Sequence, residues 1–132
     1  MANRARFFGL GILLLAGCHN WRGTDSVEIL SEQISPDGTF VATAFYCEGG
    51  GAAGYVYKNV SLRRAGEELN QRDGLLGKNK TWSGFENMAL RWIDDSNLEI
   101  SYTQNTLPAY REHNAVRTES KHFVKIHYIV TD

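Results

Sequence analysis

The segment ENMALRWIDDSNLEISY, residues 86–102, shows most clearly which fold class this chain adopts. Apolar and polar residues alternate on both sides of the turn-forming segment 94–97, which is the pattern of a β-hairpin with one buried face. A loop over residues 93–97 would bring three apolar pairs together on that face: Trp92 with Leu98, Leu90 with Ile100, and Met88 with Tyr102. The opposite face would then pair Arg91 with Glu99, a favourable cross-strand charge pair. We therefore predict an antiparallel hairpin in this register.

Strand patterns also flank the hairpin, over residues 27–34, 40–47, 55–63 and 122–130. Ser35-Pro36-Asp37-Gly38 is turn chemistry between the first two of them. The segment 40–47 is apolar on both faces, which predicts a central strand covered on both sides. About six strands with little helix predict a mainly β domain, either a single antiparallel β-sandwich or a small open barrel.

Three connections separate these strands: a glycine-rich loop over residues 48–54 and longer polar segments over 64–84 and 104–121. Connections of the last two lengths are uncommon in compact domains and are often functional or mobile. We therefore expect these segments to carry loops, with at most a turn of helix near residues 67–71.

The first eighteen residues have the organisation of an export signal. Arg4 and Arg6 precede an apolar run over residues 7–15, which is short of the roughly 20 residues of a transmembrane helix. Leu15-Ala16-Gly17-Cys18 then resembles the lipobox of bacterial lipoproteins, in which the cysteine is acylated and becomes the mature N-terminus. A plain secretory signal and an uncleaved anchor are the alternatives.

The lipobox resemblance implies a division of the chain and a location. Residues 1–17 would be the signal peptide, residues 18–26 the lipidated N-terminus and tether, and residues 27–132 the β domain. Cys18 would be the lipidation site, and the membrane would be a partner through that lipid. Because His19 follows the cysteine, the resemblance also implies sorting to the outer membrane, on the periplasmic side of the bacterial cell envelope.

The charge and the cysteine content of the expected mature chain bear on two further questions, whether it binds nucleic acid and whether it forms a disulfide. Without Arg4 and Arg6 it keeps 14 − 2 = 12 basic residues against 15 acidic ones. This acidic balance offers no electrostatic footprint for nucleic acid. Lipidation of Cys18 would leave Cys47 as the only thiol, so no disulfide forms within the domain. Since Cys47 follows an apolar run, we expect it to be buried; pairing with another chain is the alternative.

Several short motifs occur in an order that resembles a group of small bacterial lipoproteins and exported proteins. The matching segments are Ser35-Pro36-Asp37-Gly38, Phe45 with Cys47, the glycine-alanine loop, Val60-Ser61-Leu62, Trp92, and residues 98–102 and 124–128. Members carry an S-P-D-G turn, a Cys-Gly-Ala-Thr-Thr-like loop and late I-x-Y strands. This chain departs from that loop, because Cys47 is followed by Glu48 and three glycines. The resemblance implies fold and location and no particular activity.

Residues that could carry chemistry form no recognised pattern. The loop over residues 49–54 leads into a strand, whereas phosphate-binding loops open a helix. His122 and His127 are five apart and so point to opposite faces of a strand. Asp94 and Asp95 lie in a turn, where Asx-turn formation explains them. We therefore expect no metal site, no cofactor and no enzyme activity.

Aromatic residues beside the connections are the best candidates for a binding surface. The expected surface consists of Glu48, Gly50, Tyr55, Tyr57, Trp82, Phe85 and Tyr110. The alternative is that these rings close the ends of the sandwich. We expect a non-enzymatic binding or interaction module with a protein partner in the envelope. An inhibitor or immunity protein against a cell-wall hydrolase or toxin is one alternative, and an envelope enzyme is another.

Overall fold

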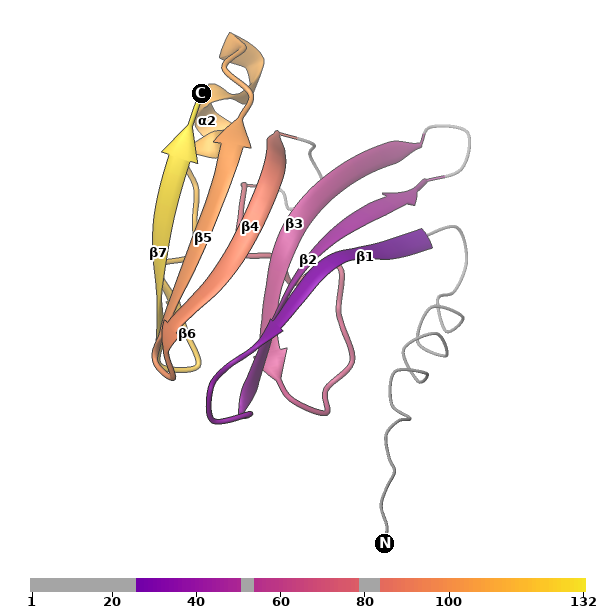
Figure 1. Cartoon of the computed structure of the whole chain (residues 1–132). Coiled ribbons are helices and arrows are strands. Elements are labelled where there is room, and N and C mark those ends of the chain that lie inside the picture. The colour runs from indigo at the N-terminus through magenta and orange to yellow at the C-terminus, as the bar shows by residue number, and fades with distance from the viewer. Residues whose placement is uncertain (1–25, 51–53, 79–83) are drawn as a thin grey trace, which may run out of the picture.

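The computed structural model describes residues 26–50, 54–78 and 84–132, which form two facing β-sheets (Figure 1). The first sheet has the order β1 (Ser26–Ile34), β2 (Phe40–Gly49), β3 (Tyr55–Arg64). The second has the order β4 (Phe85–Asp94), β5 (Asn97–Gln104), β7 (Val124–Thr131), β6 (Ser120–Lys121). A short 3₁₀ helix η2 (Pro108–Tyr110) and a one-turn helix α2 (Arg111–Asn114) follow β5. The predicted mainly β fold is confirmed, in its sandwich form.

The predicted sheet is mostly antiparallel, and one ladder of the second sheet is parallel. Strands β5 and β7 pair in parallel, with Leu98 opposite Ile126 and Ile100 opposite Tyr128. The connection after β5 carries the chain back to the end of the sheet where β5 begins, so β7 runs in the same direction as β5 (Figure 1). A parallel pair needs such a crossover, and residues 105–123 supply it.

The predicted register of the β4–β5 hairpin is confirmed in its central pairs. Trp92 lies opposite Leu98, Leu90 opposite Ile100 and Arg91 opposite Glu99. At the third predicted pair, Met88 with Tyr102, a bulge interrupts the ladder and places Asn87 and Met88 together opposite Tyr102. Asn87 adopts a positive φ of 52° there, a conformation that asparagine tolerates better than most residues. The loop is also shorter than predicted, since Asp94 already pairs with Asn97.

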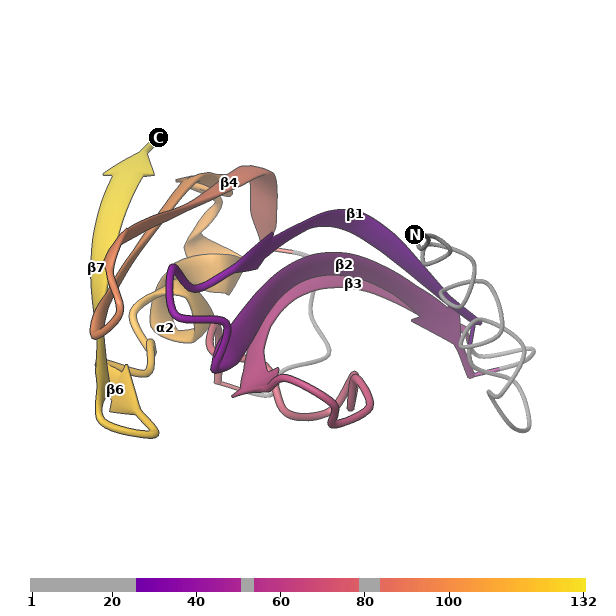
Figure 2. The same ribbon diagram turned by 60° about the horizontal axis from the view of Figure 1, so that its bottom comes forward.

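Strand β2 lies at the centre of the first sheet and is buried on both faces, as predicted. Ala42 and Ala44 pack in the main core, next to Leu62 and Val60 of β3. On the other face Phe45 and Cys47 form a smaller cluster with Tyr57. Cys47 is fully buried, which confirms the expectation for this residue. The strong curvature of this sheet, visible in Figure 2, carries the smaller cluster away from the second sheet.

The main core joins both sheets and one of the connections. Residues of β2 and β3 pack against Leu75 and Leu76 of the connection, and also against apolar residues of the second sheet. The fully or almost fully buried members from that second sheet are Phe85, Leu98, Ile100, Tyr102, Val124 and Ile126. Full burial of such side chains stabilises a fold by about 1.5–3 kcal/mol each before entropy is subtracted.

The amide side chain of Asn59 ties β3 to the connection that follows it. Its Oδ1 accepts hydrogen bonds from the backbone N–H groups of Val60 and Leu76, and its Nδ2 donates to the Leu76 carbonyl at 2.8 Å. Gly74 lies so close to this amide that a Cβ there would collide with it. A buried amide with these partners satisfied fixes the position of the connection that places Leu75 and Leu76 in the core.

The two long connections also hydrogen-bond to each other and close the open edge between the sheets. Leu76 and Arg117 form an antiparallel bridge. The Gly77 N–H donates to the Val116 carbonyl at 2.8 Å, and the Thr118 N–H donates to the Leu75 carbonyl at 2.9 Å. Both connections, which the sequence predicts to be loops, therefore form part of the sandwich.

The turn between β6 and β7 is strained. His122 and Phe123 have positive φ values of 54° and 66°, which is the combination of a type I′ hairpin turn that asparagine and glycine normally provide. The His122 ring stacks on Phe40, with ring centroids 5.7 Å apart. Phe123 is 100% exposed. A bulky residue with this backbone conformation is a genuine outlier.

Candidate functional site

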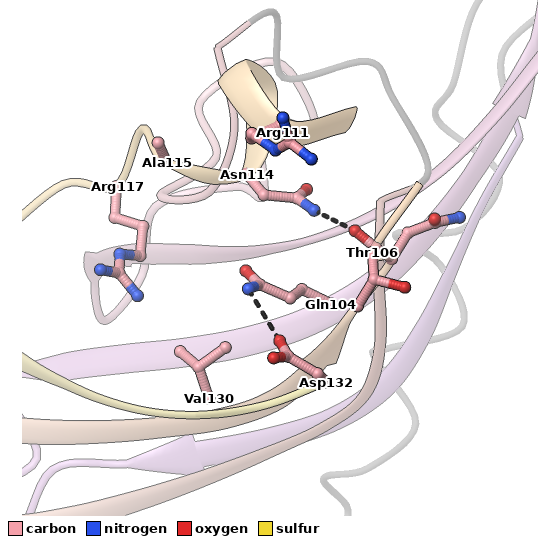
Figure 3. Close-up of a pocket in the computed structure, with 9 residues that line it drawn as sticks. Gln104, Thr106, Arg111, Asn114, Ala115, Arg117, Val130 and Asp132 are labelled. Atoms are coloured by element: carbon pink, nitrogen blue, oxygen red, sulfur yellow. Dashed lines mark hydrogen bonds between the residues drawn. The ribbon is translucent and has the colours of Figure 1, made fainter. Parts of the chain in front are cut away.

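A polar cavity of about 510 Å³ lies where β5 and β7 end, beside α2 (Figure 3). Because these two strands run parallel, their carboxyl ends meet at one edge of the sheet, and the crossover begins there. Nine residues line the cavity: Gln104, Asn105, Thr106, Arg111, Asn114, Ala115, Arg117, Val130 and Asp132. Most of these side chains carry hydrogen-bonding groups, so the lining of the cavity is polar.

Arg117 is held over an aromatic ring at one side of the cavity. Its guanidinium carbon lies 5.2 Å from the centre of the Tyr128 ring, and Nη1 donates to the Tyr102 hydroxyl at 3.4 Å. Burial raises the pKa of both tyrosines above the ordinary value, so both phenols remain neutral. The two groups that contact the Arg117 guanidinium are therefore uncharged phenols.

The other charged lining residues are Arg111 on α2 and Asp132 after β7. Within the described ranges, neither Arg111 nor Arg117 forms an ion pair with a carboxylate. The Asp132 Oδ1 accepts a hydrogen bond of 3.1 Å from Gln104 Nε2, as Figure 3 shows. The side chains that line the cavity therefore carry a formal charge of +1, from two arginines and one aspartate.

Asn114 forms the inner wall of the cavity and is 5% exposed. Its Nδ2 donates to the Asn105 carbonyl at 2.6 Å, which joins α2 to the segment that leaves β5 (Figure 3). Two polar residues on different parts of the crossover are thereby fixed relative to one another. The arrangement gives the cavity a defined shape on one side.

His113 supports this wall from behind. The ring is 4% exposed and lies against Phe85, with ring centroids 5.4 Å apart. Its Nδ1 accepts a hydrogen bond of 3.2 Å from the Lys78 N–H, and burial lowers the pKa of the imidazole. Gly77, at a positive φ of 87°, lets the backbone pass so close that a Cβ would collide with the ring.

The structure separates the residues of the predicted aromatic surface. Tyr57 is 1% exposed and Phe85 is 0% exposed, so both belong to the core instead of the surface, contrary to the prediction. Phe85 packs in the main core between the sheets, whereas Tyr57 packs with Phe45 and Cys47 in the smaller cluster on the other face of the first sheet. Tyr110 is half-buried on η2, beside the cavity. Trp82, like Cys18, lies outside the described residues.

Glu48, Gly50 and Tyr55 lie together at the opposite side of the molecule. They flank the connection between β2 and β3, which both views place far from α2 (Figures 1 and 2). Tyr55 packs against Tyr57 with ring centroids 5.7 Å apart, and Glu48 accepts a hydrogen bond from the Tyr46 hydroxyl at 3.2 Å. The predicted residues thus form two separate groups.

The three histidines of the described residues lie at different places. His113 is behind the cavity wall, His122 stacks on Phe40, and His127 is hydrogen-bonded to Asn97 at 2.8 Å. Over the part of the chain that the structure describes, no group of three or more His, Cys, Asp or Glu side chains could hold a metal ion.

Sequence reasoning did not single out the cavity residues. The available signal was the length of the connection over residues 104–121, which was expected to be functional or mobile. Its position above two parallel strand ends depends on the β5–β7 pairing, which no local pattern reveals. Arg111, Arg117 and Asp132 are separated along the chain, and only the tertiary fold brings them to one cavity.

Among the described residues, no helix has the length and apolar character that crossing a bilayer requires. Comparisons with protein-family models, with curated protein sequences and with solved structures give no match for this chain.

Proposed function

We propose that this chain is a lipid-anchored protein of the bacterial envelope and acts there as a non-enzymatic binding module. The observation that carries the binding role is the polar cavity at the ends of β5 and β7, which a rigid two-sheet scaffold supports. The anchor is supported by Leu15-Ala16-Gly17-Cys18 and the apolar run before it.

The chemistry of the cavity lining supports binding more than catalysis. Amide and guanidinium groups predominate, and these donate hydrogen bonds without titrating near neutral pH. General acid–base catalysis instead needs a group whose pKa lies near the working pH. His113 is the nearest such residue type, but its ring is buried behind the wall and packed against Phe85.

The anchor would also orient the domain. Ser26, the first residue of β1, is eight residues after Cys18, so an extended chain places it within about 28 Å of the lipid. Ser26 pairs with Glu48. On this proposal the connection between β2 and β3, with Glu48 and Tyr55, faces the membrane, while α2, which contributes to the cavity lining, is at the other side of the sandwich (Figure 1).

Fractionation of cells that express Cys18→Ser and the parent chain tests the anchor. We expect the parent in the outer-membrane fraction and Cys18→Ser in the soluble periplasmic fraction, because removal of the thiol removes the acylation site. Cys47→Ala is the matched control, since Cys47 is buried in the domain, and it should stay with the membrane. Cys18→Ser protein that remains as firmly membrane-bound as the parent would show the anchor proposal to be wrong.

A further inference from the structure

We infer that the cavity binds the oxyanion of a small molecule, a carboxylate or a phosphate group, through Arg111 and Arg117. This inference rests on the proposed binding role and adds the chemical class of the ligand. The two arginines belong to different parts of the crossover, α2 and the segment before β6, and both line the same cavity (Figure 3).

The charge of the cavity stands out against the rest of the chain. The sequence as a whole has a formal net charge of −1, whereas two guanidinium groups and one carboxylate line the cavity. In the described part of the chain neither arginine has a carboxylate partner. A guanidinium donates two parallel hydrogen bonds to a carboxylate or phosphate, and these charge-assisted bonds are among the strongest in proteins.

Arg117 is already held in place before any ligand binds. The Tyr128 ring supports its guanidinium, and the Tyr128 hydroxyl is itself fixed by a 2.6 Å hydrogen bond to the Thr118 carbonyl. The bond from Arg117 to Tyr102 uses one of its five N–H donors. A side chain held in this way loses little conformational entropy on binding, so more of the interaction energy contributes to affinity.

Substitution of Asp132 should change oxyanion affinity in the opposite direction to substitution of either arginine. Its carboxylate lies in the same cavity and accepts a hydrogen bond from Gln104, so it repels an oxyanion. Asp132→Asn keeps an acceptor for Gln104 and removes the negative charge. Oxyanion affinity should therefore rise in Asp132→Asn, whereas removal of either arginine should lower it.

The size of the cavity indicates a ligand larger than a simple ion. A volume of about 510 Å³ lies within the range of about 300–1,000 Å³ that is typical of small-molecule sites. The amides of Gln104 and Asn114 and the Thr106 hydroxyl offer further hydrogen bonds along the lining. The bound oxyanion is therefore a group of a larger polar molecule.

Titration of the full chain in mild detergent with inorganic phosphate and with citrate, at constant ionic strength set by chloride, tests the inference. The readout is the NMR shift of the Asn114 side-chain amide and the arginine Nε–H signals. We expect saturable binding of one or both probes, weakened about tenfold or more in Arg111→Gln and Arg117→Gln. Binding of phosphate alone would identify a phosphate site, and binding of citrate alone a carboxylate site.

Arg64→Gln is the matched control, because Arg64 is an exposed arginine at the end of β3 and does not line the cavity; its affinity should equal that of the parent. The inference is overturned if neither probe binds, or if Arg111→Gln and Arg117→Gln both bind the probes with the affinity of the parent. A screen of neutral and cationic small molecules on the same Asn114 signal then separates the two proposals. A saturable hit there would leave the binding role intact, and no hit would remove that role as well.

Discussion

The β4–β5 hairpin and the crossover that follows it belong to the same region of the fold but are specified in different ways. In the hairpin, residues that touch are close in sequence, and the pairs Trp92–Leu98 and Leu90–Ile100 follow from alternation and a turn. The crossover over residues 105–123 instead takes its shape from contacts with residues 75–78, far away in the chain. Local pattern therefore specifies the hairpin, and tertiary contact specifies the segment that carries the cavity.

The largest expected effect is on the hairpin side of this comparison. Ile100 is fully buried in the main core, and Ile100→Ala should lower the free energy of unfolding by about 3–4 kcal/mol through lost burial and a new cavity. Ile129→Ala is the control, since Ile129 is 51% exposed, and it should change stability by less than about 1 kcal/mol. Urea denaturation measures both. Equal effects would show that the hairpin does not anchor the core.

A slightly smaller effect is expected where a strand meets a connection. Asn59→Ala leaves the Leu76 carbonyl and the N–H groups of Val60 and Leu76 without their amide partner. We expect a loss of about 2–3 kcal/mol in the free energy of unfolding. Asn70→Ala removes only an exposed turn contact to the Arg72 N–H. If urea denaturation gives the two variants the same stability, the connection is not an integral part of the fold.

Relief of the strained β6–β7 turn should have a smaller effect of opposite sign. Phe123 is fully exposed and has a φ of 66°, so Phe123→Gly loses no burial and removes steric strain. We expect this variant to be more stable by about 1 kcal/mol, seen as a raised midpoint in thermal unfolding. Phe123→Ala keeps the Cβ and should gain little. A destabilised glycine variant would mean that the ring makes contacts that favour the folded state.

The smallest effect at neutral pH is expected for His113. Burial lowers the pKa of its ring below the ordinary histidine value of about 6.5, so the unfolded chain takes up the proton first as pH falls. Stability should therefore be complete above about pH 7 and decline as pH falls through 6.5 toward the lower folded value. Protonation of Nδ1 would also break the bond from Lys78. Denaturation series at pH 7.5, 6.5 and 5.5 measure the slope.

His113→Gln should flatten that slope, because it removes the titrating group. An internal control comes from Asp37 and Asp94, whose carboxyl pKa values are lowered by the Thr39 backbone N–H and the Asn97 side chain respectively. Their contribution is present above the unfolded value and is lost below about pH 4 in parent and variant alike. An unchanged slope between pH 7.5 and 5.5 in His113→Gln would contradict the assignment.

The features that could be predicted from the sequence are those that depend on local pattern, and the features that were missed depend on tertiary contact. The buried faces of β2, the core pairs of the hairpin and the burial of Cys47 were all predictable, because each depends on a short run of residues. The bulge at Asn87 was not, since nothing in the alternation marks it. Tyr57 and Phe85 lie beside loops in the sequence, but both are buried, Tyr57 in the smaller cluster and Phe85 in the main core. The cavity could not be predicted, because its position depends on the parallel pairing of β7 with β5.

The place of β7 has a consequence for the order in which this protein folds. It follows every other strand in the chain, yet it lies between β5 and β6 inside the second sheet. The hairpin can form early from local contacts, but it remains a two-stranded ribbon until β7 arrives. A chain that is synthesised from its N-terminus therefore completes this sheet only when β7 is free to pair with β5. Until then the outer edge of β5 lacks the partner strand with which it pairs in the folded protein, and its backbone N–H and C=O groups remain open to other chains.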